Sequence, residues 1–237
     1  MHTPYGMTIL DNCLNCPAHQ NRLFCGLAMP ALQKLNEIKS TAIYPKAALL
    51  FTEGQKPRGV FILCSGKAKL STSSSQGKTI ITKISETGDV LGLSANILGR
   101  PYEVTAEMIE PGQANFVSRE ALLQFLNDNS DVALRVGQIL SLNYFNAHEE
   151  IRTLGVANCP AEKFAKLLLS WYPARETMGI AQVKLGFTHE EIGEMIGTTR
   201  ETVTRLFTEF AQKRLLQRTG ATLVFRDKPA LIAMVHS

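Results

Sequence analysis

The chain has 237 residues, of which 45% are hydrophobic and 19% are charged, a composition that excludes a disordered chain and fits one or two globular domains. No apolar run approaches the roughly 18 residues of a membrane span, and the N-terminus has no basic stretch followed by an apolar one, so we expect a cytoplasmic protein without a membrane partner. The formal net charge of +4 permits binding to nucleic acid but does not require it.

Three of the five cysteines lie near the start of the chain. Cys13 and Cys16 form a C-x2-C pair that is followed by Cys25, and two residues between thiols allow both to reach one metal ion. Disulfides are not expected in a reducing cytoplasm. His19 would complete a Cys-Cys-His-Cys zinc site. The segment 1–29 is therefore predicted either to bind a metal or to carry thiols that bind nothing.

Short strands separated by glycines are predicted between residues 38 and 118, within a domain at 30–129. Their regular spacing favours an antiparallel roll or barrel, and the glycines suit the turns between them. The predicted strands are Ala48–Phe51, Gly59–Leu63, Ala68–Thr72, Thr79–Ile84, Val104–Ile109 and Asn115–Ser118, and the turn glycines are Gly54, Gly66, Gly77, Gly88 and Gly112.

A long helix is predicted at about Asp131–Thr153, within a segment at 130–157, after a short helix at Ser118–Leu126. Apolar and small residues recur along it at spacings of four and three, as in a coiled-coil seam, although a helix buried in one core fits the pattern equally well. The proposed seam consists of Ala133, Gly137, Leu140, Tyr144, Ala147, Ile151 and Leu154. A second stripe that would pack against the roll consists of Val132, Val136, Ile139 and Leu142.

Residues 158–237 are predicted to form a separate domain, because Pro160 disfavours helical geometry in the residue before it. Two short helices joined by a tight turn are predicted between residues 188 and 216. Thr188 and Glu191 form a capping box, and Gly197 ends the first helix. Thr199 is placed to cap the second helix. A helix at Ala161–Trp171, a hairpin (Leu215–Arg218 with Thr222–Arg226) and a closing helix after Pro229 would complete a winged helix-turn-helix.

The second of these helices has one apolar face and one polar face at about 100° per residue. Arginine can bond O6 and N7 of guanine, and glutamate can accept from N4 of cytosine, so the polar face suits the major groove. The alternative is an amphipathic surface helix whose charges are only solvated. The apolar face consists of Val203, Leu206, Phe207 and Phe210. The predicted DNA contacts are Thr188, Thr198, Thr199, Arg200, Glu201, Thr204, Arg205 and Thr208.

The segment Thr199–Leu206, TRETVTRL, resembles the recognition helix of the CRP/FNR family of bacterial regulators, named after the cAMP receptor protein and the fumarate-nitrate reduction regulator. The segments 51–54, 61–66 and 88–92 resemble the cyclic-nucleotide-binding β-roll of that family. The resemblance covers about residues 30 to 235. It implies an α+β fold with an N-terminal cyclic-nucleotide-binding-like β-roll, a long dimerisation helix and a C-terminal winged helix-turn-helix.

The resemblance also implies partners. It predicts a homodimeric transcription regulator that binds palindromic double-stranded DNA with TGTGA-like half-sites one helical turn apart and that contacts RNA polymerase. Activation and repression are both compatible with it.

The cyclic-nucleotide chemistry of the family is missing from this chain. The nucleotide binders have Glu after the glycine at position 92 and an Arg-Ser pair before a small residue, whereas this chain has Leu93 and the segment Val104-Thr105-Ala106. Without the arginine, a buried phosphate would lack its charge partner at a cost of several kcal/mol. Arg100 is close in sequence and is the one nearby residue that could take the place of the missing arginine. We therefore expect no response to cAMP, which leaves another small effector in the roll, or constitutive activity, as alternatives.

FNR-type oxygen sensors bind a four-iron, four-sulfur cluster through an N-terminal cysteine cluster and one more distant cysteine. The resemblance therefore implies an iron–sulfur cluster at Cys13, Cys16 and Cys25 and a redox or oxygen signal. Two departures stand against it. Eight residues separate the second and third cysteines, and the segment Ala114–Phe116, where the distant ligand would fall, has none. Cys64 or Cys159 would have to substitute, and zinc or no cofactor remain the alternatives.

Two other classes of protein are disfavoured. Cys64, His148 and His189 form no nucleophile–base arrangement that their spacing would bring together, and no phosphate-binding glycine loop or zinc-protease pair is present, so we expect no enzyme. A DNA-packaging protein would need more positive charge than the 11 Lys and Arg against 8 Asp and Glu in residues 160–237.

Overall fold

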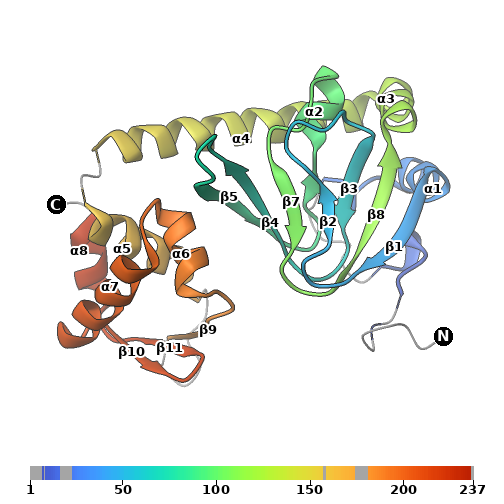
Figure 1. Cartoon of the computed structure of the whole chain (residues 1–237). Coiled ribbons are helices and arrows are strands. Elements are labelled where there is room, and N and C mark those ends of the chain that lie inside the picture. The colour runs from blue at the N-terminus through green and yellow to red at the C-terminus, as the bar shows by residue number, and fades with distance from the viewer. Residues whose placement is uncertain (1–6, 8, 17–22, 157–158, 174–180, 236–237) are drawn as a thin grey trace. The chain divides into compact units, whose positions relative to one another are not determined.

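The computed structural model describes residues 7, 9–16, 23–156, 159–173 and 181–235, and within 149–156 it describes the backbone alone. The chain divides into two compact units, residues 1–146 and 147–237 (Figure 1). The first is built mainly of strands and the second mainly of helices, which confirms the α+β prediction. No helix in the described part of the chain is both long and apolar enough to cross a membrane.

Two antiparallel four-stranded sheets form the roll of the first unit (Figure 1). One has the order β1-β8-β3-β6, and its strands are β1 (Lys39–Tyr44), β8 (Gly112–Ser118), β3 (Gly59–Leu63) and β6 (Val90–Leu91). The other has the order β2-β7-β4-β5, and its strands are β2 (Leu49–Phe51), β7 (Thr105–Met108), β4 (Ala68–Ser73) and β5 (Thr79–Ser85). Buried side chains such as Phe51, Phe61 and Met108 fill the space between the sheets.

The predicted strands are confirmed, with shifts of a few residues at some of their ends, but β1, β6 and the short helix α2 (Leu93–Leu98) were not predicted. Four of the five glycines placed in turns have positive φ angles. Gly112 is the exception, and its prediction as a turn residue is wrong because it begins β8. A Cβ there would lie 2.1 Å from the Ser65 carbonyl oxygen, so glycine is required by a close backbone approach rather than by a turn.

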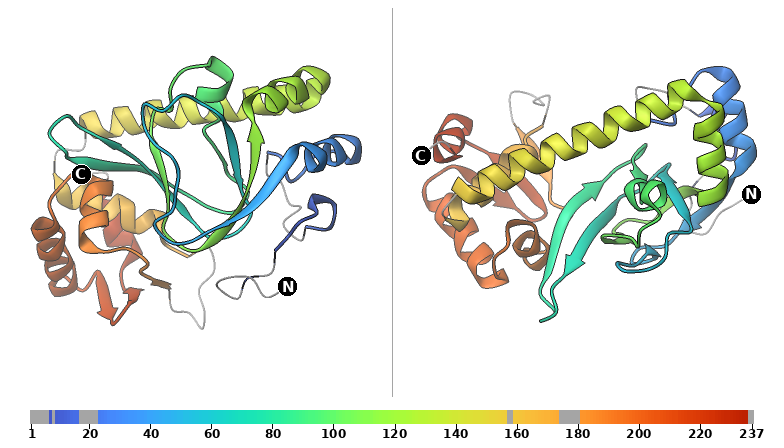
Figure 2. Two further views of the ribbon diagram at one scale, coloured as in Figure 1. Left: turned by 45° about the vertical axis from the view of Figure 1, so that its right-hand side comes forward. Right: turned by 90° about the horizontal axis from the view of Figure 1, so that it is seen from above.

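Helices cover one end of the roll. They are α1 (Met29–Ile38), α3 (Arg119–Asp128) and the first turns of α4 (Ser130–Val156), which Figure 2 shows together. Their core includes Phe24, whose fully buried ring meets the ring of Phe125 edge to face at 6.2 Å. The residues immediately before α1 are therefore packed into the roll unit.

Helix α4 has one buried face and one exposed apolar face. Val132 and Val136 are buried, and Ile139 and Leu140 are partly buried against the same core. The predicted inward stripe ends there, because Leu142 is 57% exposed. Gly137 and the side chains of Tyr144 and Ala147, from the proposed seam, are exposed. Those of Ile151 and Leu154 lie outside the described residues.

The second unit is a winged helix-turn-helix. Helices α5 (Pro160–Ser170), α6 (His189–Ile196), α7 (Arg200–Gln212) and α8 (Lys228–Val235) accompany a sheet of order β10-β11-β9. The strands β10 (Leu216–Thr219) and β11 (Thr222–Phe225) form the predicted hairpin, whereas β9 (Gln182–Lys184) was not predicted. A core of buried apolar residues, among them Phe164, Ile192 and Leu223, joins these elements.

Candidate nucleic-acid interface and candidate metal centre

The turn between α6 and α7 has the predicted caps. The Thr188 hydroxyl accepts from the Glu191 backbone N–H, and the Glu191 carboxylate accepts from the Thr188 backbone N–H. Gly197 ends α6 with φ 71°. A Cβ on Gly193 would lie 2.9 Å from the Thr198 carbonyl oxygen, so glycine at 193 lets α6 approach the turn closely. The caps and this contact hold α7 at a defined angle to α6.

Helix α7 has the predicted two faces. Val203, Leu206, Phe207 and Phe210 are buried in the core of the unit. Arg200, Glu201 and Arg205 are exposed on the first two turns. The pKa of Glu201 is lowered, first by its own backbone N–H at the helix start and then by the Thr199 hydroxyl, so Glu201 is ionised at neutral pH. Two cations and one anion therefore lie on the exposed polar face of α7, and their contact with bases stays a prediction.

The threonine hydroxyls of the predicted contact set are engaged within the protein. The Thr204 and Thr208 hydroxyls donate to the carbonyls of Arg200 and Thr204 at 3.0 and 3.1 Å. Those of Thr188 and Thr199 accept from backbone N–H groups as helix caps. Each keeps only part of its hydrogen-bonding capacity for DNA. Contacts from these residues and from Thr198 stay predictions.

A histidine that the sequence did not single out for DNA binding joins three elements of this unit. His189 Nδ1 lies 2.8 Å from Thr204 Oγ1 on α7, and its Nε2 lies 2.8 Å from Arg218 Nη1 on β10. The imidazole also stacks on Phe207, with ring centroids 4.9 Å apart. Arginine only donates, so Nε2 accepts and Nδ1–H donates to Thr204. Neutral His189 thus links the recognition helix to the wing.

This arrangement predicts a dependence of stability on pH. Burial, followed by the charges of Arg218 and Arg200, lowers the pKa of His189. The folded protein therefore binds this proton less readily than the unfolded chain, whose histidine pKa is about 6.5. We expect the resulting stability to be present above pH 6.5 and to be lost as the pH falls through the lowered pKa.

The measurement is the urea midpoint of the full chain at pH 7.5 and pH 5.5. His189→Gln keeps a polar side chain that does not titrate, and it is expected to reduce the difference between the two midpoints. His148→Gln, an exposed histidine on α4, is the matched control. An unchanged difference in His189→Gln would contradict the assignment.

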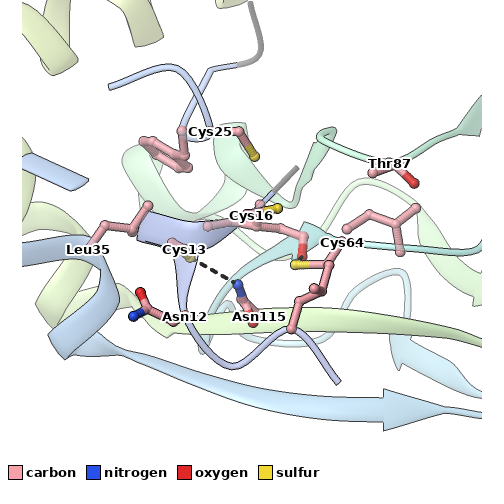
Figure 3. A pocket seen from close by; sticks show the side chains of 12 residues that line it. Asn12, Cys13, Cys16, Cys25, Leu35, Cys64, Thr87 and Asn115 are labelled. Atoms are coloured by element: carbon pink, nitrogen blue, oxygen red, sulfur yellow. Dashed lines mark hydrogen bonds between the residues drawn. The ribbon is translucent and has the colours of Figure 1, made fainter. Parts of the chain in front are cut away.

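Four cysteines from distant parts of the sequence line one pocket of the first unit (Figure 3). Cys13 begins a short 3-10 helix (Cys13–Asn15), and Cys16 directly follows it. Cys25 precedes α1, and Cys64 directly follows β3. The rest of the lining is largely apolar, and includes Phe24, Leu35 and Ile62. None of the five cysteines is disulfide-bonded. Cys159 precedes α5 in the second unit, and His19 lies outside the described residues.

Polar side chains hold the cysteine segment against the roll. The Gln113 side chain, 3% exposed, both donates to the Leu10 carbonyl at 2.9 Å and accepts from the Leu10 N–H at 2.8 Å. The Cys13 N–H donates to the Asn36 side chain at 3.0 Å. Lys39 Nζ donates to the Asp11 carbonyl at 2.7 Å. Strands β8 and β1 and helix α1 thus fix Cys13 at the pocket.

The thiols of Cys13 and Cys64 are protonated at neutral pH. Burial raises the pKa of Cys13, and the nearby Lys39 opposes that rise. Burial also raises the pKa of Cys64 to about 12, with a further contribution from the other three cysteines of the pocket. Among the described residues, no three His, Cys, Asp or Glu side chains are grouped closely enough to share a single metal ion.

Aromatic side chains fill the roll beside Gly92, the position after which the nucleotide binders of the resembled family have Glu. Tyr102 stacks on Phe51 with centroids 4.0 Å apart, and its hydroxyl donates to the Gly59 carbonyl at 2.6 Å. A Cβ on Gly92 would lie 2.6 Å from the Tyr102 ring. Leu93 is buried in the adjacent core. The expectation that cAMP does not act here stays a prediction.

Comparison with known proteins agrees with this geometry. Residues 42–129 match the cyclic nucleotide-binding domain and residues 162–234 the Crp-like helix-turn-helix domain, more than half of the chain together. A CRP-like cAMP-activated global transcriptional regulator of Mycobacterium tuberculosis is 22% identical over 210 residues, 88% of this chain and 94% of the relative. An anaerobic regulatory protein of Pasteurella multocida is 24% identical over 226 residues, 94% of this chain and 82% of the relative.

The structure of FixK2 from Bradyrhizobium japonicum has the same fold, with a TM-score of 0.72 at 22% identity over 83% of this chain and 97% of that chain. The roll, the helix-turn-helix and its exposed arginines define a DNA-binding transcription regulator. The chain belongs to the CRP/FNR family of such regulators.

Proposed function

We propose that this protein is a homodimeric, sequence-specific regulator of the cytoplasm whose DNA binding responds to oxygen or redox state through Cys13, Cys16 and Cys25. The observation that carries the proposal is the meeting of these three cysteines, with Cys64, at one pocket. The relative from Pasteurella multocida is named an anaerobic regulatory protein. The alternatives are constitutive DNA binding and a response to another effector in the roll. The relative from Mycobacterium tuberculosis, which is named as cAMP-activated, illustrates a response to an effector.

The DNA site follows from the geometry of α7. Arg200, Glu201 and Arg205 would read one half-site in the major groove, and a two-fold dimer would read a palindrome. RNA polymerase is the further partner that the family implies.

Exposed apolar side chains on α4 support dimerisation. Leu134, Tyr144 and Phe145 are 65%, 69% and 62% exposed, and large apolar side chains that gather on an exposed surface are typical of a protein interface. A Cβ on Gly137 would meet no atom within 4 Å, so a partner helix has room to approach there. This exposed face is rotated from the predicted seam, because Leu140 packs partly against its own core. We therefore centre the interface on Phe145 and Tyr144.

The donor set of the pocket suits an iron–sulfur cluster. Such clusters are held by cysteine thiolates, each bound to a different iron, and they supply an oxygen-sensitive redox centre. A single zinc ion needs all of its donor atoms close to one metal atom. The cysteines spread around this pocket therefore suit a cluster better than a single zinc ion. Zinc, or thiols without a metal, are the competing outcomes of the test below.

The cysteine segment contacts the helix that would dimerise. Cys25 is followed by Gly26, whose carbonyl accepts a hydrogen bond of 2.7 Å from Arg135 Nη1 on α4. Phe24 shares a buried core with Val132 on the same helix. A change in ligation at Cys25 would therefore act on the position of α4, and would favour one dimer arrangement over another.

The test compares wild type with the variant Cys13→Ser, Cys16→Ser, Cys25→Ser after anaerobic treatment with iron and sulfide. Wild type is expected to hold iron and sulfide and to lose DNA affinity in air, whereas the variant is expected to hold neither. Iron, zinc and sulfide analysis, visible absorption and DNA titration are the measurements. Equal iron in both proteins, together with DNA binding indifferent to air, would contradict the redox proposal. Zinc without sulfide would favour the zinc alternative.

A further inference from the structure

Strand β8 has the amide of Asn115 in the segment where the resemblance implies a distant cysteine ligand. Asn115, 2% exposed, donates from Nδ2 to Cys13 Sγ at 3.6 Å. Its Oδ1 accepts from the Thr41 hydroxyl at 2.8 Å, which orients the amide with its NH2 group toward the sulfur. Position 115 thus lines the pocket (Figure 3) but supplies a hydrogen-bond donor rather than a thiolate.

A thiol is present on the neighbouring strand instead. Strand β3 pairs with β8 up to Leu63 and Ala114, and the N–H of Cys64 then donates to the Gln113 carbonyl at 2.8 Å. The side chain of Cys64 lines the same pocket as Cys13, Cys16 and Cys25 (Figure 3). Cys64 can therefore supply the thiolate that position 115 lacks without any change in the fold.

We propose that Cys64 is the fourth ligand of the group held by Cys13, Cys16 and Cys25. The inference rests on the function proposed above, because it assigns the donor that the sensory site lacks. A four-iron cluster takes four thiolates, and this pocket brings together four of the chain's five cysteines. The fifth, Cys159, lies in the other compact unit.

The four ligands would have different roles. The cavity between them has a volume of about 20 Å³, which is room for about one water molecule. A cluster enters only when part of the wall moves outward. Cys64 is fixed by the β3–β8 ladder, whereas Cys16 and Cys25 belong to the segment that precedes α1. We therefore expect Cys64 to keep its position on the wall of the pocket when the group binds.

The experiment reconstitutes four full-length proteins anaerobically with iron and sulfide. They are wild type, Cys64→Ser, the control Cys159→Ser, and the double variant Cys64→Ser with Asn115→Cys. Iron and sulfide per chain and the visible absorption of the cluster are measured. We expect Cys64→Ser to lose the cluster or most of it, and Cys159→Ser to match wild type. The double variant places a thiol beside Cys13 and is expected to regain a cluster.

The outcomes separate this inference from the proposal on which it rests. If wild type binds iron and sulfide and the triple serine variant does not, the sensory site stands. Undiminished iron in Cys64→Ser would then overturn the role of Cys64 alone. If Cys64→Ser loses the cluster and the added Asn115→Cys does not restore it, the loss would point to damage of the roll. That outcome would also count against Cys64 as a ligand. A wild type without iron and sulfide would refute the cluster itself.

Discussion

Replacement of Tyr144 and Phe145 by glutamate is expected to convert the proposed dimer into monomers and to abolish tight binding to the proposed palindromic site. Both side chains are exposed apolar groups on α4. Contact between two copies would bury the new carboxylates without partners, at a cost of several kcal/mol. A monomer presents one recognition helix, so it loses the second half-site. Light scattering at micromolar concentration and DNA titration measure the two effects.

The matched control adds the same charge to another part of the same helix. Asn143→Glu with Asn146→Glu changes two exposed residues that lie away from the face of Leu134 and Phe145. This control is expected to remain dimeric. Leu140 is a poor choice for such a test, because it packs partly against the roll core and a charge there would also disturb folding. A Tyr144→Glu, Phe145→Glu variant that stays dimeric would place the interface elsewhere.

Replacement of Arg200 or Arg205 by alanine is expected to weaken specific DNA binding by about 1–3 kcal/mol each, roughly 5- to 150-fold. Each arginine is exposed on the polar face of α7 and would form a bidentate contact with a guanine. The preference at that base pair should relax, while binding to unrelated DNA changes less. Titration at one fixed salt concentration and selection of sites from random DNA measure affinity and preference.

Lys213→Ala is the matched control for the loss of one positive charge. Lys213 follows the end of α7 and pairs with Glu209 at 2.7 Å, far along the helix from Arg200. Its loss is expected to weaken all DNA binding slightly and to leave the selected sequence unchanged. A selected sequence that is the same for wild type and for both arginine variants would show that the base-contacting face is misassigned.

The helix-turn-helix could be predicted in detail because the signals that specify it are local. The capping pair Thr188 and Glu191, the glycine stop at Gly197 and the apolar spacing of α7 all act within a few residues. The roll was predicted less completely. Strand β6 has only two residues, too few for an alternating pattern, and α2 has only six.

The amino-acid sequence by itself determined the family, the order of the main elements and the candidate ligands Cys13, Cys16 and Cys25, because motif and periodicity are properties of short segments. Only the tertiary structure brought Asn115 to within 3.6 Å of Cys13, across 102 positions, and Arg218 to His189 across 29. It also brought Cys64 to the cysteine pocket. Such contacts depend on which strands pair and how the chain folds back, and no local pattern encodes that pairing.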